Sequence, residues 1–425
     1  MMHAPPDPHP LFILPFALLL LGIATLPLIA ARFWERHYRA FAVSLGAVSV
    51  AYYFLGLHAP HRVAATAWEY ASFIVLIGSL FTVAGGIHIG VKGEATPAKN
   101  VLFLALGAIA ANLIGTTGAS MLLIRPWIRM NKYRFTSFHA CFFIFIVSNI
   151  GGCLTPIGDP PLFLGYLKGV PFFWITVRCL PAWAFAMTTL LAIFYCIDRA
   201  NFLRAPAAVR DVETAHEEFR FDGLRNVAWL ALIVVAVFIK SPPGVREALM
   251  LVAAIGSWRT TPAAIHARNH FTFHPIEEVA WLFAGIFAAM MPAIDYLELH
   301  SATLGVSTPA HYFWFTGILS GLLDNAPTYL TFLAAAFGRH GLSLERADDM
   351  RAFLAAHPDH LLAISLASVF FGAITYIGNG PNFMVKTICE RAKVHTPGFF
   401  GYTLKFAGPV LLPVFGCVAW WCFGR

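Results

Sequence analysis

The chain has 425 residues, of which 58% are hydrophobic and 12% are charged, and its mean hydropathy is +0.69. Soluble domains carry about 25% charged residues, so the composition excludes a soluble enzyme or binding module. It indicates a polytopic membrane protein whose main partner is the lipid bilayer. The formal net charge of +7 does not point to nucleic acid, because the basic residues lie in short loops between apolar runs, where they set membrane topology.

Residues 1–197 form an ordered series of apolar segments. The run 100–128 is interrupted by Gly115 and Gly118, and each of its arms is too short for a bilayer crossing, which needs about 20 residues. We therefore expect a re-entrant helical hairpin there. The predicted elements are spans at 11–31, 41–57 and 70–91, the hairpin at 100–128, a broken span at 139–167 and a full span at 172–197.

Residues 198–225 are polar and of mixed charge, which predicts an extramembrane linker. Residues 226–425 then repeat the order of the first half, with a second hairpin tip at 324–327 and a polar loop at 338–360. The predicted elements are spans at 226–239, 247–258 and 276–297, the hairpin at 311–337, a broken span at 361–390 and a last span at 399–423.

Each half crosses the membrane an odd number of times if its hairpin does not cross, so the second half must enter with the opposite orientation. This predicts an inverted structural repeat. Most Lys and Arg residues fall in loops that lie inside when the N-terminus is outside. The predicted fold is thus an all-α polytopic membrane protein with an inverted repeat, two re-entrant hairpins, two broken helices, ten crossings and both termini outside.

Both halves are organised around a broken helix. Residues 148–161 read SNIGGCLTPIGDPP, and a helix interrupted at membrane depth frees backbone groups that only protein or a wet cavity can satisfy. Asp159 stands in this break. An ionisable residue inside a membrane is usually functional, although a proline kink with a merely satisfied carboxylate is the alternative. In the other half, residues 377–384 (IGNGPNFM) align with 157–164 (IGDPPLFL), which places Asn379 opposite Asp159.

Four polar breaks should therefore meet near mid-membrane, namely two hairpin tips and two broken-helix loops. Paired broken helices in two halves indicate the binding site of a transporter. Oxygen ligands from Thr, Asn and Asp, together with helix ends, suit a hard cation. The candidate ion- and proton-binding residues are Thr116, Thr117, Ser148, Asn149, Thr155, Asp159, Asp324, Asn325, Thr375, Asn379 and Asn382.

The two carboxylates determine the expected chemistry. Asp159 and Asp324 can each release a proton when a cation binds, and two interacting acids titrate as a pair. No Cys/His cluster suggests a resident metal, and no GxxxxGK[ST] motif suggests ATP use. We therefore expect secondary transport of small inorganic ions, with no cofactor beyond the transported Na or H ions and no enzymatic activity.

One basic residue lies near the predicted site. Lys386 follows the second break, and a buried Lys usually pairs with an acid. It can neutralise Asp159 or Asp324, or attract an anionic substrate. The alternative is that its long side chain reaches the membrane surface.

These regions resemble a known family. SNIGGCLTPIGD at 148–159 and LLDNAP at 322–327 are similar to the two signature regions of NhaD-type sodium/proton antiporters. Those antiporters belong to the ion-transporter superfamily, which also contains divalent-anion/sodium symporters, citrate transporters and arsenite permeases. TYIGNGPNFMVK at 375–386 resembles a subgroup described as citrate transporters. The resemblance spans nearly the whole chain in architecture but is strong only at the motifs.

The resemblance implies a homodimer with a scaffold part and a moving transport part, and we expect it in a bacterial inner membrane. The favoured function is sodium, or other monovalent cation, exchange for protons by alternating access. The alternative is proton- or sodium-coupled transport of citrate, a dicarboxylate or another anion. Dicarboxylate symporters of the superfamily carry Ser-Asn-Thr at both tips, whereas these tips read GTTG and DNAP, and a carboxylate at a tip repels an anion. An intramembrane aspartyl protease is disfavoured, because IGD at 157–159 lacks the first Gly of its motif.

Overall fold

The protein is built almost entirely of helices. The computed structural model describes residues 6–91, 95–204 and 220–424. Within these residues, eight helices are long and apolar enough to cross a membrane, or nine if the bent pair α15 (Ala347–Ala356) and α16 (Pro358–Phe371) counts as one span. The expected class, an all-α polytopic membrane protein, is therefore confirmed, whereas the inverted repeat and the ten crossings stay predictions.

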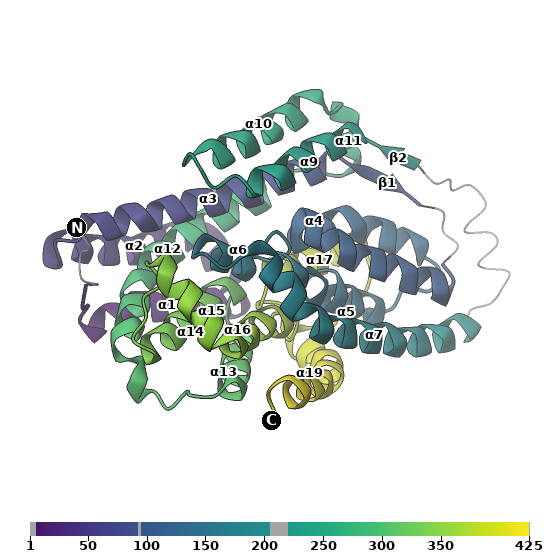
Figure 1. Ribbon diagram of the computed structural model, residues 1–425. Helices are drawn as coiled ribbons and strands as arrows, with labels where there is room; N and C mark the ends of the chain where they lie inside the picture. The colour runs from purple at the N-terminus through teal and green to yellow at the C-terminus, as the bar shows by residue number, and fades with distance from the viewer. Residues whose placement is uncertain (1–5, 92–94, 205–219, 425) are drawn as a thin grey trace.

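The helices follow one another in the predicted order (Figure 1). In the first half they are α1 (Leu14–Ile29), α2 (Ala31–Ala51), α3 (Pro60–Gly85), α4 (Pro97–Met130), α5 (Ser137–Ile146), α6 (Pro160–Leu167) and α7 (Phe172–Arg204). In the second half they are α9 (Arg225–Val237), α10 (Val245–Thr260), α11 (Ala263–Arg268), α12 (His274–His300), α13 (Pro309–Leu322), α14 (Asn325–Arg339), α15 (Ala347–Ala356), α16 (Pro358–Phe371), α17 (Gly380–Arg391), α18 (Phe399–Gly401) and α19 (Gly408–Phe423).

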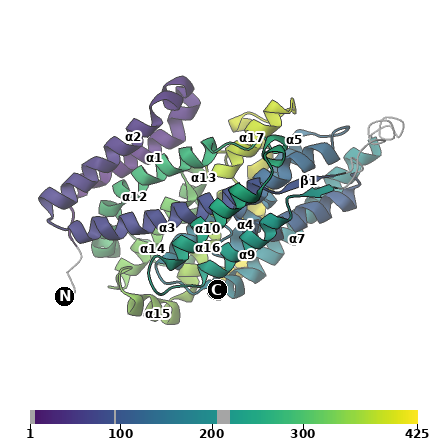
Figure 2. The same cartoon turned by 90° about the horizontal axis from the view of Figure 1, so that it is seen from above.

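The helices fall into two sets by their contacts. One set, here called the frame helices, comprises α1, α2, α3, α9, α10 and α12. In it α12 packs against α1, α2 and α3, and α10 packs against α3 and α9 (Figure 2). The other set, here called the site helices, comprises α4 to α7, α13, α14, α16, α17 and α19. The two sets meet where α12 lies on α14 and where α3 lies on α4 and α6.

The first predicted hairpin is present in α4. Asn100 near its start and Asn131 at its end donate side-chain hydrogen bonds to each other, at 2.8 and 3.1 Å. A straight helix would hold residues 31 positions apart about 46 Å away from each other, so α4 must double back. It does so at Gly115, whose φ of +75° lies in the region that glycine adopts without a steric cost.

The second hairpin consists of α13 and α14, which contact each other. Their outer ends converge on His360, whose ring lies 5.2 Å from the ring of Tyr312 on α13 and 5.7 Å from that of His340 after α14. The tip is made by extended backbone at Leu323 and Asp324. The carboxylate of Asp324 accepts a hydrogen bond from the backbone N–H of Ala326 at 3.0 Å and so caps α14.

Several predicted boundaries are wrong. The second span, expected at 41–57, is helical from Ala31. The region 338–360, expected to be a polar loop, contains α15 and the start of α16, because Met350 and Phe353 give α15 a buried apolar face. The third span ends at Gly85 rather than at 91. A short strand, β1 (His88–Gly90), follows it and pairs antiparallel with β2 (Arg220–Asp222) in the predicted linker. The same linker begins as helix up to Arg204, and its segment 205–219 lies outside the described residues.

A labelling experiment tests the predicted orientation. The broken span runs from α5 to α6, so Lys132, just before α5, lies at the opposite end of the bundle from Arg346, which is near Lys168 after α6. In a variant without native cysteines, Lys132→Cys should react with an impermeant maleimide only from inside. Arg346→Cys should react only from outside. Labelling of both from one side would contradict this topology.

Candidate functional site

In each broken helix, one polar side chain stands at the N-cap position of the helix that follows the break. Asp159 precedes Pro160 and has extended backbone (φ −142°, ψ 144°), and Asn379, two residues before Pro381, is also extended (φ −154°, ψ 138°). Pro160 favours extended backbone at Asp159 directly before it, and both Pro160 and Pro381 lie in the first turn of a helix, where proline is well tolerated. Neither side chain caps its own helix, so both are free to point at other parts of the chain.

The carboxylate of Asp159 is the point at which the four breaks meet. Its Oδ1 accepts hydrogen bonds from the hydroxyl of Thr116 at 2.7 Å and from the amide of Asn379 at 2.9 Å. Its Oδ2 accepts one from the amide of Asn325 at 2.6 Å. All four side chains are buried. The structure thus brings together residues from the first hairpin tip, both broken helices and the second hairpin tip.

Amide side chains hold the two broken helices against each other. Asn379 also donates to the carbonyl of Ser148 and to Oδ1 of Asn149, both at 3.2 Å. Asn149 in turn donates to Oδ1 of Asn382 at 2.7 Å, and Asn382 donates to the carbonyls of Gly372 and Thr375. These predicted site residues surround Asp159 but mainly satisfy the backbone groups that the breaks leave open.

Two predicted ligands have the same bracing contacts in both halves. The hydroxyl of Thr155 donates to the carbonyl of Asn112 at 2.6 Å, and that of Thr375 donates to the carbonyl of Gly321 at 2.7 Å. Each hydroxyl also accepts a hydrogen bond, at 3.1 Å, from the backbone N–H of the glycine three residues later. Each threonine therefore ties the break of its own half to the hairpin of that half.

The second hairpin tip carries a carboxylate and an unused acceptor. Asp324 is half-buried and caps α14, and Asn325 follows it directly. The carbonyl oxygen of the Asn325 side chain is buried and has no hydrogen-bond partner among the described residues. Buried polar atoms are nearly always satisfied, so this oxygen is a candidate ligand that points to an occupant of the site.

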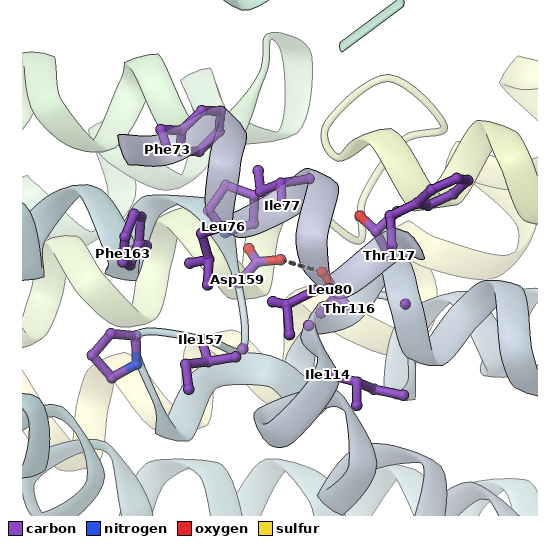
Figure 3. Close-up of a pocket in the computed structure, with 16 residues that line it drawn as sticks. Phe73, Leu76, Ile77, Leu80, Ile114, Thr116, Thr117, Ile157, Asp159 and Phe163 are labelled. Carbon is purple, nitrogen blue, oxygen red and sulfur yellow. Dashed lines mark hydrogen bonds between the residues drawn. The ribbon is translucent and has the colours of Figure 1, made fainter. Parts of the chain in front are cut away.

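A small cavity borders the carboxylate (Figure 3). The cavity has a volume of about 30 Å³. This is enough for an ion or a few water molecules but too small for a tricarboxylate. Its walls come from α3, from the tip of α4 and from the first break. The lining includes Phe73, Leu76, Leu80, Thr116, Thr117, Ile157, Asp159 and Phe163. Asp159 is the single ionisable residue in this lining.

Lys386 is engaged outside the cavity. Its ammonium group pairs with Glu390 one helical turn further along α17, at 2.6 Å, and lies over the ring of Tyr376. The hydrogen bonds and ion pairs of the described residues do not join it to Asp159 or Asp324. In this conformation the structure therefore gives Lys386 a partner other than the site carboxylates.

Sequence reasoning missed two residues that shape the site. Asn112 lies on the first arm of the α4 hairpin, four residues before Thr116 in the chain. It donates to the carbonyl of Gly151 at 2.6 Å and accepts from the backbone N–H of Leu154 at 2.8 Å. Ser120, one turn after Thr116, shares a hydrogen bond of 2.8 Å with Ser148. The spacing of four places Ser120 on the same helical face as Thr116, whereas Asn112 lies on the other arm, across the turn at Gly115. Both are polar residues in an otherwise apolar segment, a signal that could have identified them.

Comparisons with known proteins agree with a membrane transport role. A family model described as "Putative citrate transport" matches residues 8–423. The chain is also 25% identical over 343 residues to a "46 kDa membrane protein" of Mycobacterium leprae, and the match covers 74% of each chain.

Two glycines in the second break provide a matched test of its packing. A Cβ on Gly378 would lie 2.7 Å from the carbonyl oxygen of Gly372 and 2.9 Å from that of Ser320, whereas one on Gly380 would meet nothing within 4 Å. Gly378→Ala should lower the free energy of unfolding by about 1–3 kcal/mol because the backbone must move. Gly380→Ala should change it by about 0.5 kcal/mol or less. Thermal unfolding in detergent measures both, and equal melting temperatures would show that the close backbone approach is unimportant.

Proposed function

Because the chain belongs to the family described as "Putative citrate transport", it is a membrane transporter, and on that premise we propose that it exchanges a monovalent cation, sodium first, for protons at Asp159. The exchange works by alternating access of the site to the two faces of the membrane. The observation that carries the proposal is the charge of the cavity, whose single ionisable lining residue is an acid. Such a site attracts a cation and repels a carboxylate substrate.

The available ligands suit a hard cation. The carboxylate of Asp159, the hydroxyl of Thr116 and the unused carbonyl of Asn325 are all oxygen donors. Oxygen ligands of this kind are those that hard cations prefer. A hydrated cation that enters this buried site must exchange its water molecules for such oxygens. The side-chain carbonyl of Asn325 is already buried there without a partner in the described part of the chain.

The same groups can hold a proton instead. The ionised Asp159 accepts three hydrogen bonds from Thr116, Asn325 and Asn379. A protonated Asp159 needs an acceptor, and rotation of the Asn325 amide presents its carbonyl in place of its N–H donors. The cation and the proton thus require the same rearrangement and exclude each other, and mutual exclusion with alternating access is sufficient for antiport.

Asp324 adds a second negative charge at the hairpin tip. It precedes Asn325, whose amide contacts Asp159, so the two acids lie on either side of one bridging residue. We propose that Asp324 raises the affinity of the site for cations and couples their binding to proton release.

The alternative is cation-coupled transport of citrate, and the family description favours it. Citrate carries three carboxylates and needs basic partners or accompanying cations. Lys386 is the nearest such partner on the second broken helix, and this alternative requires it to leave Glu390. A cation site at Asp159 would then serve a symporter instead of an antiporter.

The first functional test removes the charge of Asp159. In inside-out vesicles, added sodium should dequench an internal pH dye in the wild type, and Asp159→Asn should reduce the initial rate by at least about tenfold. Asp348→Asn is a matched control, since Asp348 is exposed on α15 and pairs with Arg351, and it should exchange normally. A dye signal that requires citrate and disappears in Lys386→Gln would support the alternative.

The second functional test measures competition with protons. Lowering the pH protonates the site carboxylates and so weakens cation binding, by up to about tenfold per pH unit when one proton competes with one cation. We expect the half-saturating sodium concentration to rise as the pH falls from 9 to 6. Asp324→Asn should flatten this dependence while retaining weak sodium binding. A half-saturating concentration that does not change with pH in the wild type would exclude competition.

A further inference from the structure

A second buried charged cluster lies at the other end of α6 from Asp159. It contains two cations and four acids that the proposed transport site does not use. Its members, here called the boundary cluster, are Arg62, Glu69, Lys168, Asp295, Glu298 and Glu345. Arg62, Lys168, Asp295 and Glu298 are buried, and burying a charge is costly unless it is paired.

The boundary cluster joins the frame helices to the site helices. Lys168, at the end of α6, pairs with Glu69 of the frame helix α3 at 2.6 Å and with Glu345 after α14 at 2.8 Å. Arg62 of α3 pairs with the same Glu345 at 3.3 Å. Two ion pairs therefore cross between the sets, one from Lys168 and one from Arg62.

Further contacts hold the boundary cluster, some within the frame helices and some between α12 and the segment after α14. On the frame side, Asp295 of α12 holds Arg62 at 2.9 Å and accepts a hydrogen bond from the hydroxyl of Tyr53 at 2.6 Å. Glu298, one turn further on, accepts from the backbone N–H of Leu344 at 3.0 Å and from the hydroxyl of Ser343 at 3.1 Å, both on the segment that carries Glu345. Burial opposes ionisation of Glu345, but Lys168 and then Arg62 outweigh it and hold its pKa below the ordinary value.

Two of these charges, Lys168 and Glu345, follow helices that begin at the transport site. Asp159 is the first residue before α6, and Lys168 follows its last residue, a distance of about 14 Å along the helix axis. Asp324 likewise caps α14, and Glu345 lies just after the turn that follows that helix. A movement of the site helices that exposes Asp159 to this face must therefore pull Lys168 and Glu345 away from α3.

We infer that the boundary cluster is a gate that closes the transport site to the face of the membrane on which Lys168 lies, and that its two crossing ion pairs break when the site opens to that face. The inference rests on the proposed alternating access. Removing one partner leaves the other charges buried and unpaired, which strongly destabilises the closed arrangement. Weakening the gate should therefore shift the population toward the state that is open on this face.

The test measures accessibility on each face separately. In the full-length chain without native cysteines, Ile77→Cys on α3 places a thiol in the lining of the cavity. Lys168→Gln should make its labelling by an impermeant maleimide roughly tenfold faster from the Lys168 face and slower from the opposite face. Glu69→Gln removes the same contact from the frame side and should act in the same direction, so the test does not depend on one variant folding.

Arg39→Gln is the control. Arg39 of α2 pairs with Glu277 of α12 at 2.9 Å, so this variant loses an equal charge from a pair that lies within the frame helices. Both labelling rates should stay within about twofold of the reporter alone. Faster labelling from both faces in Lys168→Gln would mean general loosening and would overturn the gate, as would unchanged rates.

The labelling assay requires no transport, which separates the two proposals. One-sided opening in Lys168→Gln together with no sodium-driven proton movement in the wild type would support the gate and contradict cation/proton exchange. Normal exchange with no one-sided opening would contradict the gate alone.

Discussion

The structure depends on one constraint, which is that backbone groups freed inside a membrane must find partners within the protein. Two broken helices and two hairpin tips each free such groups, and none of the four could satisfy them alone. Together they do, because the side chains of each break hydrogen-bond to another. Thr155 and Thr375 bind carbonyls of the hairpins, and Asn149, Asn379 and Asn382 bind carbonyls and amides of the broken helices. The meeting of the breaks at one place is therefore a requirement of stability as much as of function.

The site that results has matching geometry and unequal chemistry. Asp159 and Asn379 occupy equivalent extended positions, 220 residues apart, and the amide of Asn379 donates to the carboxylate of Asp159 at 2.9 Å. An acid in both positions would place two negative charges in contact, and an amide in both would leave no charge. The acid–amide pair instead provides one charge with a donor already bound to it, so the two equivalent positions do not repel each other.

The sequence was sufficient to locate the breaks, because Gly and Pro interrupt a membrane helix and an Asp within an apolar segment must be enclosed by protein or water. The sequence could not show which polar residues line the site and which only stabilise the breaks. Thr116 and Thr155 are the same residue type, yet the hydroxyl of Thr116 binds the carboxylate of Asp159 and that of Thr155 binds a backbone carbonyl. Lys386 has Glu390 at the favourable spacing of four, so a partner on its own helix was visible in the sequence.

No pattern in the sequence predicts the boundary cluster. In the sequence, Arg62 and Lys168 resemble ordinary charged residues of exposed loops. They are buried only because α3 packs against α6 and against the segment after α14. The polar composition of α15 likewise conceals the buried face formed by Met350 and Phe353. Both features depend on contacts between segments that are distant in the chain, and no local spacing predicts such contacts.

The close approach of Gly378 to the carbonyls of Gly372 and Ser320 has a consequence for how this fold can change over time. The close contacts at Gly378 are made by main-chain atoms, whereas Asn379 next to it holds the break through its side chain, which donates to Ser148, Asn149 and Asp159. A larger residue at position 378 would displace the backbone, and a residue without an amide at position 379 would remove hydrogen bonds while leaving the path of the backbone open. Change over time at the second break is therefore limited by space at one position and by hydrogen bonding at the next.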